Sequence, residues 1–138
     1  MEKDRIALAR YRLEKSYEKL KSAIDLLNNE DYADSLGRSY YAIFSATRAL
    51  LALKGLDSRK HTGVISLFNR NFVKTGVVSK ELSKIIESAK INREKSDYGD
   101  FVEVSREMAE HQIGKARGFI KEIEKAINIL IGNEGIPK

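Results

Sequence analysis

The densest chemistry in the chain lies at residues 93 to 98, an Arg-Glu-Lys-Ser-Asp-Tyr run. Arg93 offers a permanent cation with a rigid fork of N–H donors, which matches the oxygens of a phosphate. Asp97 follows at the spacing of an ion pair on one helical face, and the phenol of Tyr98 is a poor base at neutral pH because tyrosine has a reference pKa of about 10. We expect the run either to hold a phosphate, with Tyr98 hydrogen-bonding or stacking on a base, or to form a local helix cap.

Five other side chains are candidates to line a substrate-binding surface with Arg93: Arg38, Tyr41, Arg48, His61 and Glu94. Arg38 and Arg48 are ten residues apart, which places them roughly on one side of a helix. Tyr40 falls on the apolar stripe of the same helix, so we expect it to pack in the core.

Two histidines complete the inventory of groups that exchange protons near neutral pH. His61 stands near the basic middle of the chain, either as a capping or surface residue or as an acid–base group near Arg93. His111 is expected to face solvent. No His, Asp and Glu spacing converges on a metal site, so neither a metal nor a cofactor is expected.

Length and composition predict one domain over residues 1–132, followed by a flexible tail at 133–138. The absence of cysteine excludes disulfides, thiol catalysis and cysteine-ligated zinc. No apolar run approaches the roughly 18 residues of a membrane helix, and no secretion leader is apparent, so we expect a cytoplasmic protein without membrane contact.

The net charge of +5 is unevenly distributed. Residues 54 to 95 carry ten basic and four acidic side chains, whereas the rest of the chain carries 15 basic and 16 acidic ones. The excess positive charge therefore lies in the middle third, where it favours either a polyanion such as RNA or simply a solvated, lysine-rich surface.

Apolar residues recur at alternating three- and four-residue steps, the spacing of amphipathic helices. The second of these helices has the widest apolar stripe, so we expect it to lie centrally and to run antiparallel to the first. The sequence predicts an all-α, five-helix up-and-down bundle with three long and two short helices. The expected helices cover about 4–28, 32 to a stop at Gly55, a short one around 64–72 ending near Gly76, 79 to about 95, and 105 to a stop at Gly132. Residues 96–100 break the pattern, and residues 101–104 form a connector.

Several segments, in order, resemble the HEPN domain family, in particular its small free-standing members. These segments are residues 38–46, 48–51 with 55–56, 61–68, 72–76, 93–100 and the closing amphipathic helix. The resemblance covers most of the chain, and it implies a five-helix domain that is commonly a homodimer.

Many HEPN domains are metal-independent RNases with an arginine, four to six residues, and then a histidine. Arg93 matches the motif arginine, but Tyr98 stands where the histidine would be, and Glu94 stands where a polar residue usually follows the arginine. Metal-independent cleavage needs groups that transfer protons and a cation that stabilises the phosphorane. Arg93 still supplies the cation, whereas tyrosine in place of histidine transfers protons poorly at neutral pH.

Three functions remain open on this basis. The first is an RNA- or nucleotide-binding module with a degenerate RNase motif, paired with a minimal nucleotidyltransferase in a toxin–antitoxin-like system, as the resemblance implies. The second is an active endoribonuclease toxin in which Arg93 works with Tyr98, Asp97 or His61. The third is a helical scaffold dimer that never touches nucleic acid.

Overall fold

The computed structural model describes residues 2–98 and 103–133, and within them it contains helices and no strand. The elements are α1 (Lys3–Asn28), α2 (Tyr32–Ala52), α3 (His61–Phe68), the π-helical segment η1 (Asn69–Val73), α4 (Lys80–Tyr98) and α5 (Arg106–Asn133). The predicted all-α architecture with five helices is confirmed.

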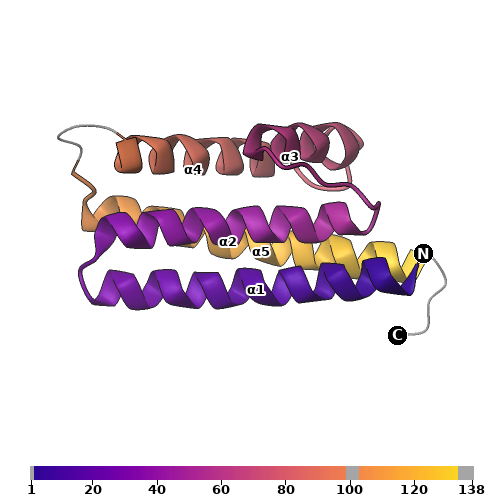
Figure 1. Ribbon diagram of the computed structural model, residues 1–138, viewed down its shortest axis with the longest axis horizontal. Helices are drawn as coiled ribbons and strands as arrows, with labels where there is room; N and C mark the ends of the chain where they lie inside the picture. The colour runs from indigo at the N-terminus through magenta and orange to yellow at the C-terminus, as the bar shows by residue number, and fades with distance from the viewer. Residues whose placement is uncertain (1, 99–102, 134–138) are drawn as a thin grey trace.

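The three longest helices lie side by side, and α3 and α4 cover the side of α2 that faces away from α1 (Figure 1). Helix α2 packs against each of the other four helices. It is also the most apolar of the long helices, with 13 of its 21 residues buried. The predicted position of this helix at the centre of the core is confirmed.

A tight turn at residues 29–31 makes α1 and α2 antiparallel neighbours, as predicted (Figure 1). Glu30 adopts a φ of 65°, and Ser35 of α2 donates a hydrogen bond to the carbonyl of Ala23 across the pair. Because the hairpin is antiparallel, the C-terminal half of α2 lies beside the N-terminal half of α1. This is why Arg12 of α1 reaches the backbone carbonyl of Arg48 in α2.

Helix α4 continues to Tyr98, three residues beyond the end predicted at Lys95. Two i,i+4 ion pairs, Lys90 with Glu94 and Arg93 with Asp97, link successive turns of this stretch. Such pairs favour helix continuation, so Arg93 and Asp97 lie within a helix and not in a turn after it. The expected helix break at residues 99–100 and the start of the connector at 101–102 lie outside the described residues, as does the tail from residue 134.

A buried polar cluster fixes α4 and α5 against α2. Gln112 of α5 donates to the carbonyl of Leu36 at 2.8 Å and to the hydroxyl of Ser39 at 2.7 Å, and its own carbonyl accepts a bond from Asn92 of α4 at 3.2 Å. Because Asn92 precedes Arg93, this cluster also sets where Arg93 lies along α2.

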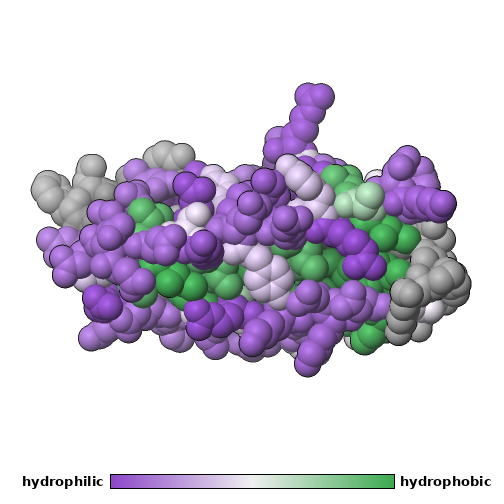
Figure 2. Space-filling view, turned by 90° about the horizontal axis from the view of Figure 1, so that it is seen from below, coloured by the Kyte–Doolittle hydropathy of each residue, from purple (hydrophilic) through white to green (hydrophobic). Residues whose placement is uncertain are grey.

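One side of the bundle leaves apolar surface uncovered. Seen from the α1 side, hydrophobic residues form a broken band between rows of hydrophilic ones (Figure 2). Leu8 and Tyr11 of α1 and Ile129 of α5 are exposed apolar side chains. Within the described part of the chain, no helix combines the length and the apolar character needed to cross a bilayer.

Candidate functional site

Arg93 lies over two aromatic rings of α2. Its guanidinium carbon is 5.0 Å from the ring centre of Tyr41 and 5.9 Å from that of Tyr40, and its Nε is 3.1 Å from a carboxylate oxygen of Asp97. The Arg93 side chain is 22% exposed. A cation above aromatic faces is attracted by their negative quadrupole, so the guanidinium is held in place while part of it stays accessible to a ligand.

His61, the first residue of α3, meets the same tyrosines from another side. Its Nδ1 is 2.9 Å from the hydroxyl of Tyr40, and its ring centre lies 4.2 Å from that of Phe44 and 6.0 Å from that of Tyr41. The prediction that Tyr40 packs in the core is confirmed, since its ring is fully buried. Its hydroxyl nevertheless reaches the imidazole, a contact that the apolar periodicity did not indicate.

The surroundings of His61 favour the neutral imidazole. Partial burial lowers its pKa below the ordinary 6.5, and the positive charges of Arg93, Lys90 and Arg48 lower it further, against a smaller opposing effect of Glu94. Burial raises the pKa of Tyr40 to about 12, so this phenol keeps its proton at neutral pH. The pair therefore consists of a protonated hydroxyl and an uncharged imidazole.

The depressed pKa of His61 predicts a loss of stability in mild acid. An unfolded histidine takes up its proton near pH 6.5, whereas folded His61 resists protonation, so the unfolded state binds more protons and the free energy of unfolding falls as the pH drops from about 7 to about 5. His61→Gln should remove this part of the slope in urea denaturation. His111→Gln, at an exposed position, should keep the dependence of stability on pH that wild type shows. Equal pH dependence in wild type, His61→Gln and His111→Gln would contradict the assignment of this effect to His61.

Tyr41 separates two hollows that open on this surface. The first, here the histidine groove, has a volume of about 650 Å³ and is lined by Lys19, Tyr41, Phe44, Ser45, Arg48, Asp57, Ser58, Arg59 and His61. The second, here the arginine groove, has a volume of about 470 Å³ and is lined by Leu26, Ala33, Asp34, Gly37, Arg38, Tyr41, Arg93 and Asp97. Six of the residues singled out from the sequence therefore line one continuous surface: Arg38, Tyr41, Arg48, His61, Arg93 and Asp97.

Of the two remaining predicted site residues, Glu94 is placed differently and Tyr98 stays a prediction. Glu94 is exposed and pairs with Lys90, so it lines neither groove. For Tyr98 the structure describes the backbone at the end of α4, and its side chain lies outside the described part.

Asp57 is a site residue that the sequence analysis missed. It accepts two hydrogen bonds from Arg48, at 2.8 and 3.2 Å, and one from Arg12 at 3.4 Å. The hydrogen bond from Arg48 holds the pKa of Asp57 below its ordinary value. The available signal was an acid two residues after the Gly55 stop in a basic region, but only the packing of α1 against α2 brings Arg12 to it.

Lys19 of α1 was also missed, because it lies far in sequence from the basic middle third. Its ammonium donates to the hydroxyl of Ser45 at 2.8 Å in the histidine groove. Burial, and then the charges of Arg38 and Arg48, lower its pKa. The charged residues lining this groove are thus three cations and one carboxylate, and the surface is electropositive.

Comparison with known proteins places this arrangement in a family. The HEPN domain matches residues 9–126. This chain belongs to the HEPN family. Relatives of this chain include a UPF0332 protein of Thermotoga maritima, 47% identical over 76% of this chain and 80% of its own length. Two proteins of Methanocaldococcus jannaschii, each named "Putative toxin", are 33% and 36% identical over 87% and 86% of this chain and 84% and 88% of their own lengths.

Membership of the HEPN family confirms the resemblance on which the fold was predicted. In this HEPN chain Arg93, which the sequence analysis predicted to be the motif arginine, lies 5.0 Å from the ring centre of Tyr41, and the imidazole of His61 from a different helix lies 6.0 Å from the same ring. Across residues 2–98 and 103–133, no three His, Asp or Glu side chains gather closely enough to hold a metal ion. What the surface offers to a ligand is five cationic side chains, aromatic rings and the imidazole of His61, together with the carboxylates of Asp34, Asp57 and Asp97.

Proposed function

We propose that this HEPN-type module binds single-stranded RNA along the two grooves and cleaves it weakly or not at all. The observation that carries the proposal is the partly exposed guanidinium of Arg93, which lines the arginine groove and is held over Tyr41, the residue that lines both grooves. Guanidinium groups bind phosphates, and aromatic side chains stack on unpaired bases in a sequence-tolerant way.

A phosphate can replace the partner that Arg93 has in the free protein. The Asp97 side chain is 42% exposed, and ion pairs of such accessibility contribute little net free energy because water and salt screen them. RNA phosphates would therefore exchange with the carboxylate at small cost, while Arg38 and Arg48 contact neighbouring phosphates on either side of Tyr41.

The available groups support binding better than hydrolysis. Cleavage without a metal needs one group that accepts the proton of the ribose 2′-hydroxyl and another that protonates the leaving 5′-oxygen. His61 is a base with a lowered pKa, and one of its two nitrogens is already bonded to Tyr40. A second imidazole is absent from the residues that line the two grooves.

One observation favours active endoribonuclease as the second candidate. His61 and Arg93 of the same chain share the aromatic neighbours Tyr40 and Tyr41, so an imidazole and a phosphate-binding cation lie on one surface. In that reaction Arg93 would hold the scissile phosphate and His61 would accept the 2′-hydroxyl proton. Tyr98 or a protonated Asp97 would donate a proton to the leaving 5′-oxygen.

An RNA assay in EDTA separates the two candidates and the scaffold alternative. We expect wild-type protein to bind a labelled single-stranded RNA with an affinity that falls steeply as salt rises, and to leave the RNA intact. Cutting that disappears in Arg93→Ala would replace the binding proposal by the nuclease. Absence of binding even at low salt would leave only a helical scaffold.

We further propose a homodimer and a minimal nucleotidyltransferase partner in a toxin–antitoxin-like pair. The dimer is supported by the exposed apolar side chains of α1 and α5, and the partner by the resemblance to small HEPN proteins encoded beside such enzymes. Light scattering should give about twice the 15.6 kDa chain mass. Co-purification with a nucleotidyltransferase encoded next to this chain tests the partner, and a monomer that elutes alone would contradict both.

Asp57→Asn is expected to strengthen RNA binding by about threefold at low salt, because it raises the local charge and releases Arg48 and Arg12 from a competing carboxylate. Anisotropy titrations at two salt concentrations measure the effect. The gain should shrink at high salt, and weaker binding by Asp57→Asn would mean that the carboxylate positions Arg48 for the RNA.

A further inference from the structure

Lys19 is the lysine of α1 that lines the histidine groove. Its ammonium donates to the hydroxyl oxygen of Ser45 at 2.8 Å, and its side chain is partly buried. Among the ion pairs of the described residues, none includes Lys19. Lys15, one turn earlier on the same helix, has a side chain that is 43% exposed and pairs with Glu18 at 3.3 Å. Lys15 is therefore a matched control for Lys19.

The surroundings of Lys19 favour its uncharged amine. Burial lowers its pKa, and the positive charges of Arg38, Arg48 and Lys15 lower it further. Glu18 opposes this with a smaller effect on Lys19, whereas its hydrogen bond and charge raise the pKa of Lys15. An amine is a nucleophile only after it has lost its extra proton, so near neutral pH a larger fraction of Lys19 than of Lys15 is reactive.

The hydroxyl of Ser45 is free to assist at the same point. Ser16 and Ser39 each donate to the carbonyl three residues earlier, at 2.6 and 2.8 Å, which is a usual bond for a serine inside a helix. Among the described residues, Ser45 donates no such bond, and its oxygen accepts the bond from Lys19. The hydrogen of this hydroxyl is therefore available to a carbonyl oxygen brought beside the amine.

The histidine groove also provides cations for a phosphate next to Lys19. Arg48 follows Ser45 by three residues, so the two side chains are neighbours on one face of α2. Arg59 lines the same groove, and no ion pair within the described part of the chain includes it. Arg48 pairs with Asp57 at 2.8 Å, but both side chains are more than a third exposed, and a phosphate can replace so accessible a carboxylate at small cost.

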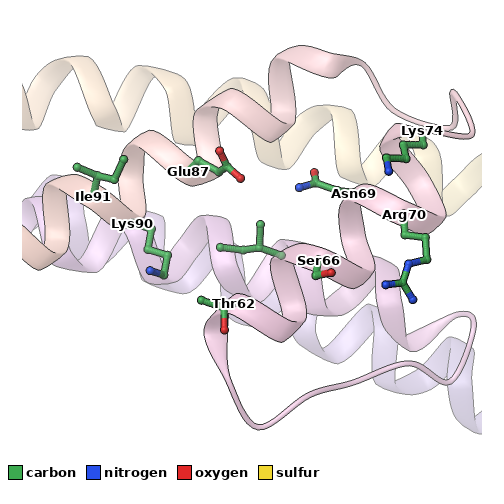
Figure 3. Close-up of a pocket in the computed structure, with 9 residues that line it drawn as sticks. Thr62, Ser66, Asn69, Arg70, Lys74, Glu87, Lys90 and Ile91 are labelled. Carbon is green, nitrogen blue, oxygen red and sulfur yellow. The ribbon is translucent and has the colours of Figure 1, made fainter.

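Lys74 shows the same combination of a hollow and an arginine without burial of the amine. It lies with Arg70 on the η1 side of a hollow of about 550 Å³ between α3, η1 and α4 (Figure 3). The Lys74 side chain is exposed, so water solvates its charge. Lys74 is thus a second control, which separates the effect of a neighbouring arginine from that of the groove around Lys19.

We propose that Lys19 is a site of acylation by acyl phosphates, small anions whose acyl group is bonded to a phosphate oxygen. Arg48 and Arg59 would bind the phosphate group, and the Ser45 hydroxyl would donate to the acyl oxygen. The neutral amine attacks the acyl carbon, so a nitrogen–carbon bond forms and the bond from that carbon to the phosphate oxygen breaks. The phosphate leaves with the electron pair and takes up the proton that the nitrogen loses, which yields an amide and hydrogen phosphate.

Mass spectrometry of the full chain after incubation with acetyl phosphate near neutral pH tests the site. We expect acetylation at Lys19 to be about fivefold or more faster than at Lys15 or Lys74, because a larger share of its amine is unprotonated. Inorganic phosphate should slow the reaction at Lys19 and not at Lys15, because it competes for the two arginines of the groove. Equal rates at the three lysines, or equal slowing by phosphate, would overturn the proposal.

Ser45→Ala tests the positioning role of the hydroxyl. It removes the hydrogen-bond partner of the amine and the donor to the acyl oxygen, so acetylation at Lys19 should slow about threefold or more while that at Lys15 is unchanged. Ser45→Thr keeps a hydroxyl and should restore most of the rate. An unchanged rate at Lys19 in Ser45→Ala, with the circular dichroism spectrum of wild type, would show that the assignment of Ser45 is wrong.

Acylation of Lys19 would also regulate the RNA-binding surface, a consequence that rests on the function proposed above. The amide is uncharged, so the histidine groove would lose one of its three cations. Lys19→Gln should therefore weaken binding of single-stranded RNA about threefold to tenfold, whereas Lys19→Arg should stay within about twofold of wild type. Equal RNA affinity in both variants would refute the regulation. Failure of wild type to bind RNA would refute the proposed function alone, since the acetylation measurement uses no RNA.

Discussion

Arg93→Ala is expected to lower the affinity for single-stranded RNA by about tenfold or more. Each charge-assisted contact between a guanidinium and a phosphate contributes on the order of 1.5–3 kcal/mol, and Arg93 is held in position for such a contact by Tyr41 and Tyr40. Fluorescence anisotropy with a labelled oligonucleotide measures the loss. The slope of log affinity against log salt should also fall by about one, as for the removal of one phosphate contact.

Two control variants distinguish a ligand contact from a helix cap. Arg117→Ala removes an exposed arginine of α5 outside both grooves and should change the RNA affinity by less than about twofold. Asp97→Asn removes the carboxylate that competes with RNA for Arg93, so its affinity should be equal to or higher than that of wild type. If Arg93→Ala and Asp97→Asn lower stability alike and neither alters RNA binding, the pair only extends α4.

The largest effect on folding is expected for Gln112→Ala, which should lower the free energy of unfolding by about 2–4 kcal/mol. Gln112 is 4% exposed and bonds to α2 and α4 at once, so truncation removes three hydrogen bonds and leaves a cavity between the helices. Urea denaturation followed by circular dichroism measures the loss.

Gln112→Met keeps most of the side-chain volume and removes only the hydrogen bonds. It should cost less than Gln112→Ala, and the difference between the two variants measures the packing contribution. Because Gln112 holds Asn92, which precedes Arg93 on α4, both variants should also weaken RNA binding. Stability within about 0.5 kcal/mol of wild type for both would show that the bundle does not depend on this cluster.

Local sequence patterns were sufficient to predict features that depend on residues near one another in the chain, such as helix positions and caps. The apolar periodicity placed α2 in the centre, and Gly55 ends that region with a φ of 67°, the left-handed conformation expected of a glycine stop. Ser105 caps α5 as predicted, since its hydroxyl accepts a bond from the amide of Met108 at 3.1 Å. The end of α4 was harder to predict from the sequence. Its last residues are polar and show no apolar periodicity, whereas ion pairs between residues four apart continue the helix to Tyr98.

The candidate site was only partly accessible from the sequence for a different reason. The motif arginine and its aromatic neighbours could be named, since residue type and helical spacing show what each side chain can do. His61 contacts Tyr40, which is 21 positions away in the sequence. Arg12 donates a hydrogen bond to Asp57, which is 45 positions away. Such contacts depend on which helices pack together and on how far each is shifted along its axis relative to the other. A single sequence does not reveal that shift.

The amino-acid sequence by itself predicted an all-α HEPN bundle, which is confirmed, and it shows a cationic middle third. That Tyr98 stands in place of the motif histidine stays a prediction. The tertiary structure alone decided that Arg93 and His61, on different helices, both lie near the ring of Tyr41. The physical reason is that helix formation depends on side chains within a few residues of each other, whereas a site depends on distances between helices set by packing of the whole core.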